Sequence, residues 1–340
     1  MENAAVHAVR RRSFGEWLKT RKGQQAIVIF CFSAIPLLLL LVFTYLPFGE
    51  MVGYSFYKMK YVGAKEFVGF DNYRTLFART DIIGALKLSL YYMAGAIFQI
   101  ALALYLATIL LMGIRGGNFF KGCMFFPYLI NGIAIGFIFK FFFTRGFVFD
   151  TVLSWCGFNP DSLPYWLKDQ SINNWSLVGS SVWRYFGQNM VLFIGAMMSV
   201  DNSLYEAADL DGANKFQQFR YIILPSIKTI VTLNIILSIT GSLSAFEAPF
   251  VITDGANGTG TFFIVMNTIA HTNQKVGLAS AMAVFLLCVI FICTLLQKLL
   301  FKYLFRNATT DDEGYDAKKK RLKAKRAAQK AQKTMQKGAC

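Results

Sequence analysis

Long apolar blocks alternate with short polar segments along this chain. The first block, Ala26 to Phe48, has the length that a helix needs to cross a bilayer. A secretory signal has a shorter apolar core and a small-residue cleavage site, so we expect this block to remain as a membrane span. Similar blocks follow, and the pattern predicts six transmembrane helices, at about 26–48, 82–112, 119–143, 175–200, 221–246 and 276–303.

The same pattern divides the chain into three parts. We expect a basic N-terminal arm at 1–25, a six-span all-α membrane domain at 26–306 and a basic tail at 307–340. Pro36 should kink the first span because proline removes a backbone hydrogen bond. Polar connections are expected at 49–80 and 144–174, and an irregular segment rich in Gly, Thr and Asn at 247–275.

Composition supports a polytopic membrane protein. The chain is 55% hydrophobic and 16% charged, against roughly 45–50% and 25% in soluble proteins. The net charge is +16, and residues 318–340 contribute ten Lys or Arg and no acid. Such a tail suits a tether near anionic lipid. Because no nucleic-acid recognition module accompanies the tail, we do not expect a nucleic-acid partner.

Positive charge also predicts the orientation. The N-terminal arm, the turn after the second span, the segment 203–228 and the residues from Lys298 onward hold 24 of the 35 Lys and Arg. The positive-inside rule therefore places both termini and the segment 203–228 in the cytoplasm.

That cytoplasmic segment contains a long polar island between two apolar blocks, from Ser203 to Pro225. Ser203 with Glu206 has the spacing of a capping box, and Asn214 with Gln217 repeats it. Gly212 stands where a helix end favours a left-handed residue. The island therefore predicts two short helices that meet at an angle. A well-capped interhelical loop with no further role would show the same pattern.

The island resembles the EAA loop of ABC-importer permeases, most closely that of the carbohydrate-uptake permeases related to the maltose transporter. The resemblance covers about twenty residues with their spacing intact, and Val68 to Tyr73 is similar to a second element of the same family. It implies that the loop is a coupling helix that fits a cleft on an ATPase subunit. The residues that would couple to the ATPase are Glu206, Ala207, Ala208, Asp211, Gly212, Ala213, Leu224 and Pro225.

The resemblance also implies partners. The chain would pair with a second homologous permease, as a heterodimer, with two cytoplasmic ATPase subunits and with an extracytoplasmic solute-binding protein. Its cargo would be a carbohydrate, specifically an oligosaccharide. The chain would be located in the bacterial plasma membrane, where lipid surrounds it. ATP and magnesium would be bound by the ATPase subunits, and this chain would hold no cofactor.

The residues themselves point to no catalytic chemistry. No GxxxxGK[ST] element occurs, and the glycine-rich run at 255–260 has no following lysine, so we expect no phosphate cradle. His7 and His271 have no obvious acidic or cysteine partners nearby. The six cysteines form no CxxC pair, and we interpret those in apolar blocks as small buried hydrophobic residues. We therefore predict no catalytic residues, no metal site and no enzyme.

Polar residues inside the predicted spans mark a candidate pathway, because such residues usually face a bundle interior or a cavity. In the fifth span several recur at helical spacing, and the fourth span has a similar polar face. Aromatic rings with hydroxyl, amide and guanidinium groups suit a sugar, which also draws attention to Trp183. The candidate pathway residues are Tyr128, Asn131, Ser181, Arg184, Tyr185, Gln188, Asn189, Asn234, Ser238, Gly241, Ser242 and Phe246.

Other readings stay open at this point. Ser, Gly and Asn in spans also hold helices together without touching cargo. The chain could be a secondary transporter or channel, although such carriers commonly show repeats and intramembrane acids, and we find neither a clear repeat nor many acids in the spans. It could also be an ABC permease for a non-sugar solute.

Overall fold

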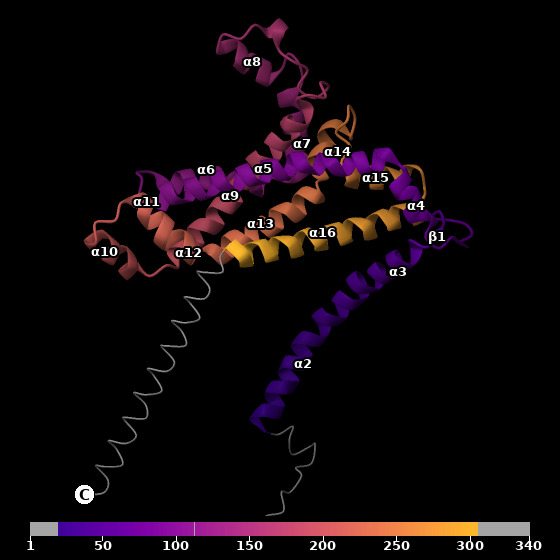
Figure 1. The fold of residues 1–340 in the computed structure, drawn as a ribbon, viewed down its shortest axis with the longest axis horizontal. Coiled ribbons are helices and arrows are strands. Elements are labelled where there is room, and N and C mark those ends of the chain that lie inside the picture. The colour runs from indigo at the N-terminus through magenta and orange to yellow at the C-terminus, as the bar shows by residue number, and fades with distance from the viewer. Residues whose placement is uncertain (1–19, 112, 305–340) are drawn as a thin grey trace, which may run out of the picture.

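A computed structural model describes residues 20–111 and 113–304, and helices dominate it (Figure 1). Most of the predicted N-terminal arm and all of the predicted tail lie outside the described residues. The body is a bundle of elongated helices that lie side by side. Its main members are α5 (Thr80–Leu111), α6 (Gly117–Leu129), α9 (Asn173–Met198), α13 (Lys228–Leu243) and α16 (Val276–Leu304).

Length and composition identify the membrane-crossing elements. Within the described ranges, four helical stretches are long and apolar enough to span a bilayer, at Gly23–Tyr54, Thr80–Leu111, Lys228–Thr253 and Val276–Phe301. A bent pair makes a fifth if it is counted as one span. Helix α9 has 26 residues, enough for a crossing, but it is not among these stretches. The chain is thus a polytopic helical membrane protein, and the count of six spans stays a prediction.

The predicted third span, 119–143, is not one continuous helix. The structure breaks it between α6 and α7 (Gly132–Phe143), whose axes differ by 98°. Ile130 adopts an extended conformation, and the Asn131 side chain accepts a hydrogen bond from the Ile133 N–H at 2.9 Å, which caps α7. Because asparagine favours such caps, a new helix begins here instead of continuing the old one. Helix α7 consequently turns away from the bundle axis (Figure 1).

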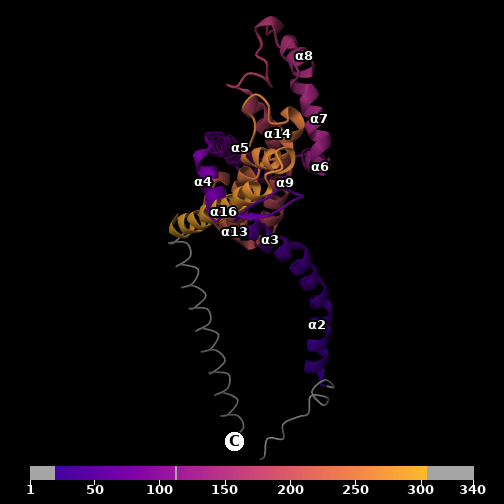
Figure 2. The same ribbon diagram turned by 90° about the vertical axis from the view of Figure 1, so that its right-hand side faces the viewer.

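The first apolar block forms a separate arm. It consists of α2 (Arg21–Leu40), a π-helical turn at Leu41–Tyr45 and α3 (Leu46–Tyr54). Pro36 lies within α2, and the irregular turn follows shortly after it. Figures 1 and 2 both show this arm leaving the bundle at an angle. None of its most apolar window is buried, which suits a helix that lies in lipid or against another membrane chain.

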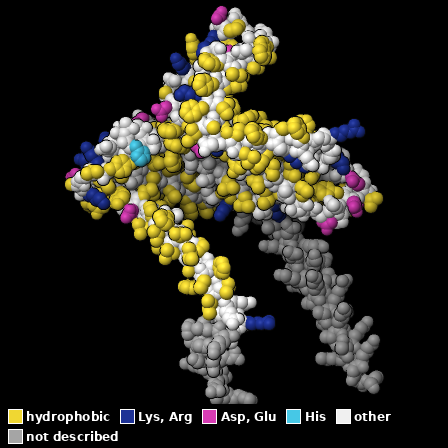
Figure 3. Space-filling view, turned by 180° about the vertical axis from the view of Figure 1, so that it is seen from behind, with side chains coloured by type: hydrophobic (Ala, Val, Ile, Leu, Met, Phe, Trp, Pro, Cys, Tyr) yellow, Lys and Arg dark blue, Asp and Glu magenta, His cyan; other side chains and the backbone are white. Residues whose placement is uncertain are grey.

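Apolar side chains also cover the outside of the bundle (Figure 3). Charged groups gather toward its two ends in the same view. The prediction that the cysteines of the apolar blocks are buried is wrong: Cys31, Cys123 and Cys288 are exposed, and Cys293 is intermediate. These thiols belong to the outer, lipid-compatible surface instead of the core.

Glycines allow the bundle helices to approach closely. A Cβ on Gly187 of α9 would lie 1.8 Å from the Met124 carbonyl oxygen of α6. A Cβ on Gly95 of α5 would lie 2.2 Å from Val178 Cγ1 of α9. Contacts this short are impossible for a real Cβ, so α6, α9 and α5 can pack in this way only because these positions lack a side chain.

The end of the bundle opposite α10 (Asn202–Leu210) and α11 (Lys215–Gln218) is more ordered than the sequence indicates (Figure 1). A two-stranded antiparallel hairpin pairs β1 (Tyr57–Lys58) with β2 (Glu66–Phe67), and α4 follows at Asp71–Ala78. The segment 247–275, predicted to be irregular, instead holds three short helical elements. They are α14 (Glu247–Thr253), α15 (Phe262–Asn267) and a π-helical turn at Thr268–Thr272.

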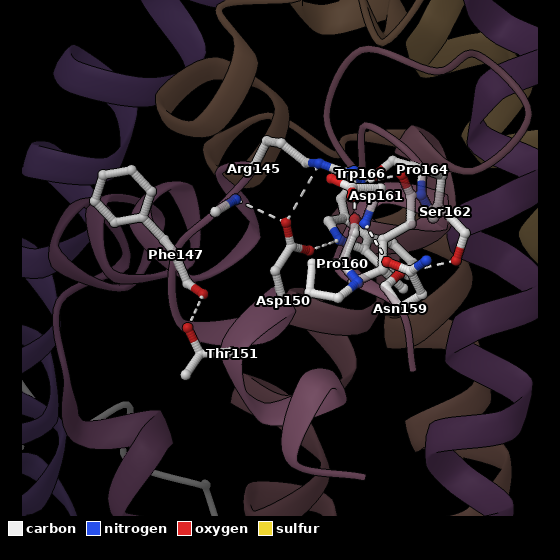
Figure 4. A network of polar contacts seen from close by, with 12 residues as sticks. Arg145, Phe147, Asp150, Thr151, Asn159, Pro160, Asp161, Ser162, Pro164 and Trp166 are labelled. Carbon is white, nitrogen blue, oxygen red and sulfur yellow. Dashed lines mark hydrogen bonds and ion pairs between the residues drawn. The ribbon is translucent and has the colours of Figure 1, made fainter. Parts of the chain in front are cut away.

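The loop predicted at 144–174 contains α8 (Val148–Trp155), a short 3-10 turn (Pro160–Ser162) and a polar network around the buried Asp150 carboxylate (Figure 4). The Asp150 carboxylate accepts hydrogen bonds from Gly146 N and Trp166 Nε1, both at 2.7 Å, and faces the Arg145 guanidinium. Arg145 in turn donates to the carbonyl oxygens of Pro160 and Leu163. One ion pair and the hydrogen bonds around it therefore join the start of this projecting segment to residues 160–166.

Candidate functional site

The polar island of the sequence forms an angular segment at one end of the bundle, which we call the elbow, residues 202–226. Helix α10 (Asn202–Leu210) comes first. The predicted Ser203–Glu206 capping box is wrong, because the helix starts earlier and Asp201 caps it. Asp201 Oδ1 accepts the Ser203 N–H at 3.0 Å, and this hydrogen bond holds the pKa of the Asp201 carboxyl below its usual range. Glu206 is therefore not needed as a cap.

The corner of the elbow has the predicted chemistry. Gly212 adopts a left-handed conformation with φ of +72°, and the Ala213 N–H donates to the Ala208 carbonyl at 2.9 Å. Helix α11 (Lys215–Gln218) follows, and the Asn214–Gln217 capping box is confirmed, with reciprocal bonds of 2.9 and 2.8 Å. A π-helical turn (Phe219–Ile223) and α12 (Leu224–Ser226) lead into α13.

The acidic side chains of the elbow have different environments. Asp209 accepts hydrogen bonds from Gln218 at 2.5 Å and from Lys215 at 3.5 Å, so it fastens α10 to α11. Glu206 and Asp211 are exposed, and the described part of the chain gives Glu206 no side-chain partner. Exposed apolar side chains accompany them, since Leu210 is 90% and Phe216 73% exposed. The outer surface of the elbow thus combines exposed carboxylates with exposed apolar side chains, as protein interfaces do.

The inner surface of the elbow is part of the bundle core. Ile223 and Ile227 are buried in one cluster with Ala103 of α5 and Phe193 of α9, and Tyr205 of α10 packs against it. Close-packed interiors transmit displacement instead of absorbing it. The elbow therefore packs directly against α5 and α9.

Those two helices, with α7, α13 and α14, line a partly open cavity of about 490 Å³. The volume falls in the range of roughly 300–1,000 Å³ that small-molecule sites occupy. The wall is largely apolar, with hydroxyl and amide groups at intervals. The Tyr92 hydroxyl and the Asn189 amide nitrogen are buried and have no hydrogen-bond partner among the described protein atoms. Such groups usually bond to water or to a bound polar molecule.

The structure gathers most of the predicted pathway residues around this cavity. Lining positions from the fourth and fifth predicted spans are Ser181, Arg184, Tyr185, Gln188, Asn189, Asn234, Ser238, Gly241, Ser242 and Phe246. Tyr128 and Asn131 do not line it: the Tyr128 ring lies 6.2 Å from that of Tyr185, and Asn131 caps α7. Trp183 is also absent from the wall and packs on Phe139 of α7. Whether any lining residue contacts cargo stays a prediction.

Sequence reasoning missed part of the wall. Tyr92 and Gln99 line the cavity from α5. They lie seven residues apart, which places them on one helical face, and this spacing within an apolar block was a usable signal. Glu247 also lines the cavity, and its carboxylate pairs with the Arg184 guanidinium. That contact joins positions 63 residues apart, and no local pattern indicates it.

His271, which lies within the described residues, contacts a tyrosine that is distant in sequence. His271 Nδ1 lies 2.8 Å from the Tyr61 hydroxyl on the exposed surface. Across residues 20–111 and 113–304, no group of three or more His, Cys, Asp or Glu side chains is arranged to hold a metal ion.

Comparisons with known proteins agree with the sequence motif. The family model described as "Binding-protein-dependent transport system inner membrane component" matches residues 99–306. The probable ABC transporter permease protein YurN of Bacillus subtilis (strain 168) is 30% identical over 82% of this chain and 98% of its own. The probable starch degradation products transport system permease protein AmyD of Thermoanaerobacterium thermosulfurigenes is 28% identical over 82% of this chain and 95% of its own.

A solved structure shares the fold. A chain from a bacterial ABC transporter involved in the import of the acidic polysaccharide alginate superposes with a TM-score of 0.72. It is 19% identical in sequence, and the match covers 83% of this chain and 98% of that one. The family model covers most of the chain, including the elbow and the fourth to sixth predicted spans. This protein therefore belongs to the inner membrane components of binding-protein-dependent transport systems, the permeases of ABC importers.

Proposed function

We propose that this chain is the transmembrane permease subunit of an ATP-driven, binding-protein-dependent sugar importer, and that it forms half of the translocation pathway. The observation that carries the proposal is the shared core: one packed cluster joins the exposed elbow to helices that line a cavity with a largely apolar wall and scattered polar groups. Relatives named for transport of starch degradation products and of multiple sugars support a carbohydrate cargo, specifically an oligosaccharide.

In the proposed assembly the chain pairs with a second, homologous permease in a heterodimer. Two cytoplasmic ATPase subunits bind and hydrolyse ATP, and a solute-binding protein delivers cargo from outside. The chain crosses the plasma membrane six times, with α6 and α7 sharing one crossing and both termini in the cytoplasm. The exposed surface of α2 and α3 supports contact with lipid or a second permease.

Transport in this scheme needs no chemistry on the sugar. Closure of the ATPase dimer moves the elbow, with Glu206, Ala207, Ala208, Asp211, Gly212 and Ala213 at the interface and Leu224–Pro225 at the join to α13. Because Ile223 and Ile227 are buried against α5 and α9, the displacement reaches the cavity wall and alternates its access. The ATPase only has to stabilise one of the two states more than the other.

The cargo assignment is tested with the complete importer in proteoliposomes. Uptake of labelled malto-oligosaccharides, arabino-oligosaccharides, chito-oligosaccharides and a dipeptide is compared, each with its cognate binding protein added. We expect ATP-dependent uptake of at least one glycan series and none of the dipeptide. Uptake of the dipeptide with no uptake of any glycan would contradict the sugar assignment.

Gly212 gives a sharper test of the elbow. A side chain in the left-handed conformation costs about 1–2 kcal/mol, and nothing lies within 4 Å of a Cβ at this position. Gly212→Ala is therefore expected to distort the corner and lower uptake per ATP hydrolysed severalfold. Gly212→Asn is the matched control, since asparagine tolerates this conformation and should keep more of the coupling. Equal uptake by Gly212→Ala and the parent would contradict the role of the turn.

A further inference from the structure

The cavity contains a single ion pair, formed between two helices that are far apart in sequence. Among the described residues that line it, Arg184 of α9 and Glu247 of α14 carry the only ionisable charges. The Arg184 Nη1 group donates to Glu247 Oε2. One positive and one negative group thus give the wall no net charge.

The pair is fixed by its surroundings. The Arg184 guanidinium lies 4.9 Å from the centre of the Tyr185 ring, a cation–π distance. A Cβ on Gly132 would lie 2.2 Å from Glu247 Oε2 and 2.4 Å from Arg184 Nη1. A side chain at position 132 would therefore have to displace the pair, which lies directly against the start of α7. Three elements, α7, α9 and α14, meet at this contact.

The two side chains of the ion pair differ in how far they are exposed. The Arg184 side chain is 15% exposed and the Glu247 side chain 52%. The Arg184 Nε group is buried and has no hydrogen-bond partner among the described atoms. A largely buried guanidinium is costly unless a carboxylate compensates it. Glu247 fills that role here, and both side chains of the pair line the cavity.

We propose that Glu247 sets the charge class of the cargo, because it occupies Arg184 and so makes the cavity select uncharged glycans over uronates. This assignment rests on the proposed function and names the glycan class within it. A uronate carboxylate is a natural bidentate partner for arginine. It can reach Arg184 only by displacing Glu247, and it meets the like charge of that residue as it does so. Neutral hydroxyl groups meet no such repulsion.

The proposal predicts a reversal of preference. The probes are digalacturonate and its dimethyl ester, which share one skeleton and differ in charge. Binding of each to the complete importer in lipid nanodiscs, without binding protein, is measured at pH 7 by thermophoresis. The parent should bind the ester more tightly than the acid. Glu247→Gln keeps the side-chain volume but frees Arg184, and should shift the acid-to-ester affinity ratio toward the acid by about ten- to hundredfold.

A double variant shows whether Arg184 causes the shift. Arg184→Gln with Glu247→Gln removes both charges and should abolish the shift toward the acid. An unchanged ratio in Glu247→Gln, or the same shift in the double variant, would overturn the assignment while leaving a glycan pathway intact. Binding of neither disaccharide to any of the three proteins would contradict the assignment and count against glycan passage through the cavity as well. High salt should weaken acid binding to Glu247→Gln more than ester binding.

Discussion

Replacing Glu206 with lysine is expected to lower ATP-driven uptake by roughly tenfold or more. In the proposed assembly Glu206 pairs with a basic group of the ATPase subunit, and reversing its charge would break that contact. Glu206 is exposed on α10, and Asp201 caps that helix in its place. The substitution should therefore leave the fold of the chain unchanged. Uptake and ATP hydrolysis are measured together in proteoliposomes, with expression and thermal stability as checks on the fold.

The matched control makes the same charge change at the other end of the bundle. Glu66 lies in the hairpin strand β2, with its side chain 69% exposed and 3.8 Å from Lys58. Exposed pairs of this kind contribute about 0–1 kcal/mol, so Glu66→Lys should retain near-parental uptake. Comparable losses in the two variants would mean that the Glu206 result reports general damage. Parental uptake by Glu206→Lys would contradict a role for this carboxylate in coupling.

Gly187→Ala is expected to destabilise the bundle strongly. The new Cβ would lie 1.8 Å from the Met124 carbonyl oxygen and 2.5 Å from its carbonyl carbon. These are backbone atoms, so α6 and α9 must separate to admit the methyl group. Overpacking of a close contact costs about 1–3 kcal/mol, and occasionally more. The melting temperature of the detergent-solubilised complex, read by size-exclusion chromatography after heating, should fall clearly.

Gly195→Ala on the same helix, α9, is the control that tests whether the steric contact at position 187 causes the loss of stability. Nothing lies within 4 Å of a Cβ at that position, and alanine is more favourable than glycine in a helix by about 0.5–1 kcal/mol. The control should therefore be neutral or slightly stabilising. If both substitutions gave the same melting temperature, the close approach of α6 and α9 at Gly187 would be wrong.

Local signals predicted the elbow well. A left-handed glycine and a reciprocal capping box depend on residues within a few positions, so Gly212 and the Asn214–Gln217 pair were readable from the sequence. The predicted Ser203–Glu206 capping box at the start of α10 is wrong. Asp201, two residues upstream, accepts the Ser203 N–H that the Glu206 side chain would accept in such a box. Both candidates obey the same rule, and only the backbone path decides between them.

The cavity was harder to predict because its wall comes from several elements. Helical spacing grouped Asn234, Ser238 and Ser242 correctly on the cavity side of α13. Spacing does not predict that Asn131 starts a new helix at 98° to the last one. Nor does it bring Glu247 to Arg184, a pair that forms beside Gly132 at the start of α7. Contacts between residues this far apart in sequence follow from the tertiary fold, which local sequence patterns do not encode.

Reconstitution with and without the ATPase subunits tests the central claim most directly. Proteoliposomes that contain the permease pair are loaded with ATP and supplied with binding protein and a labelled glycan, and uptake is followed over time. We predict uptake only when the ATPase subunits are present, and its loss when a non-hydrolysable ATP analogue replaces ATP. Sustained uptake by the permease pair alone, driven by an ion gradient, would contradict the account.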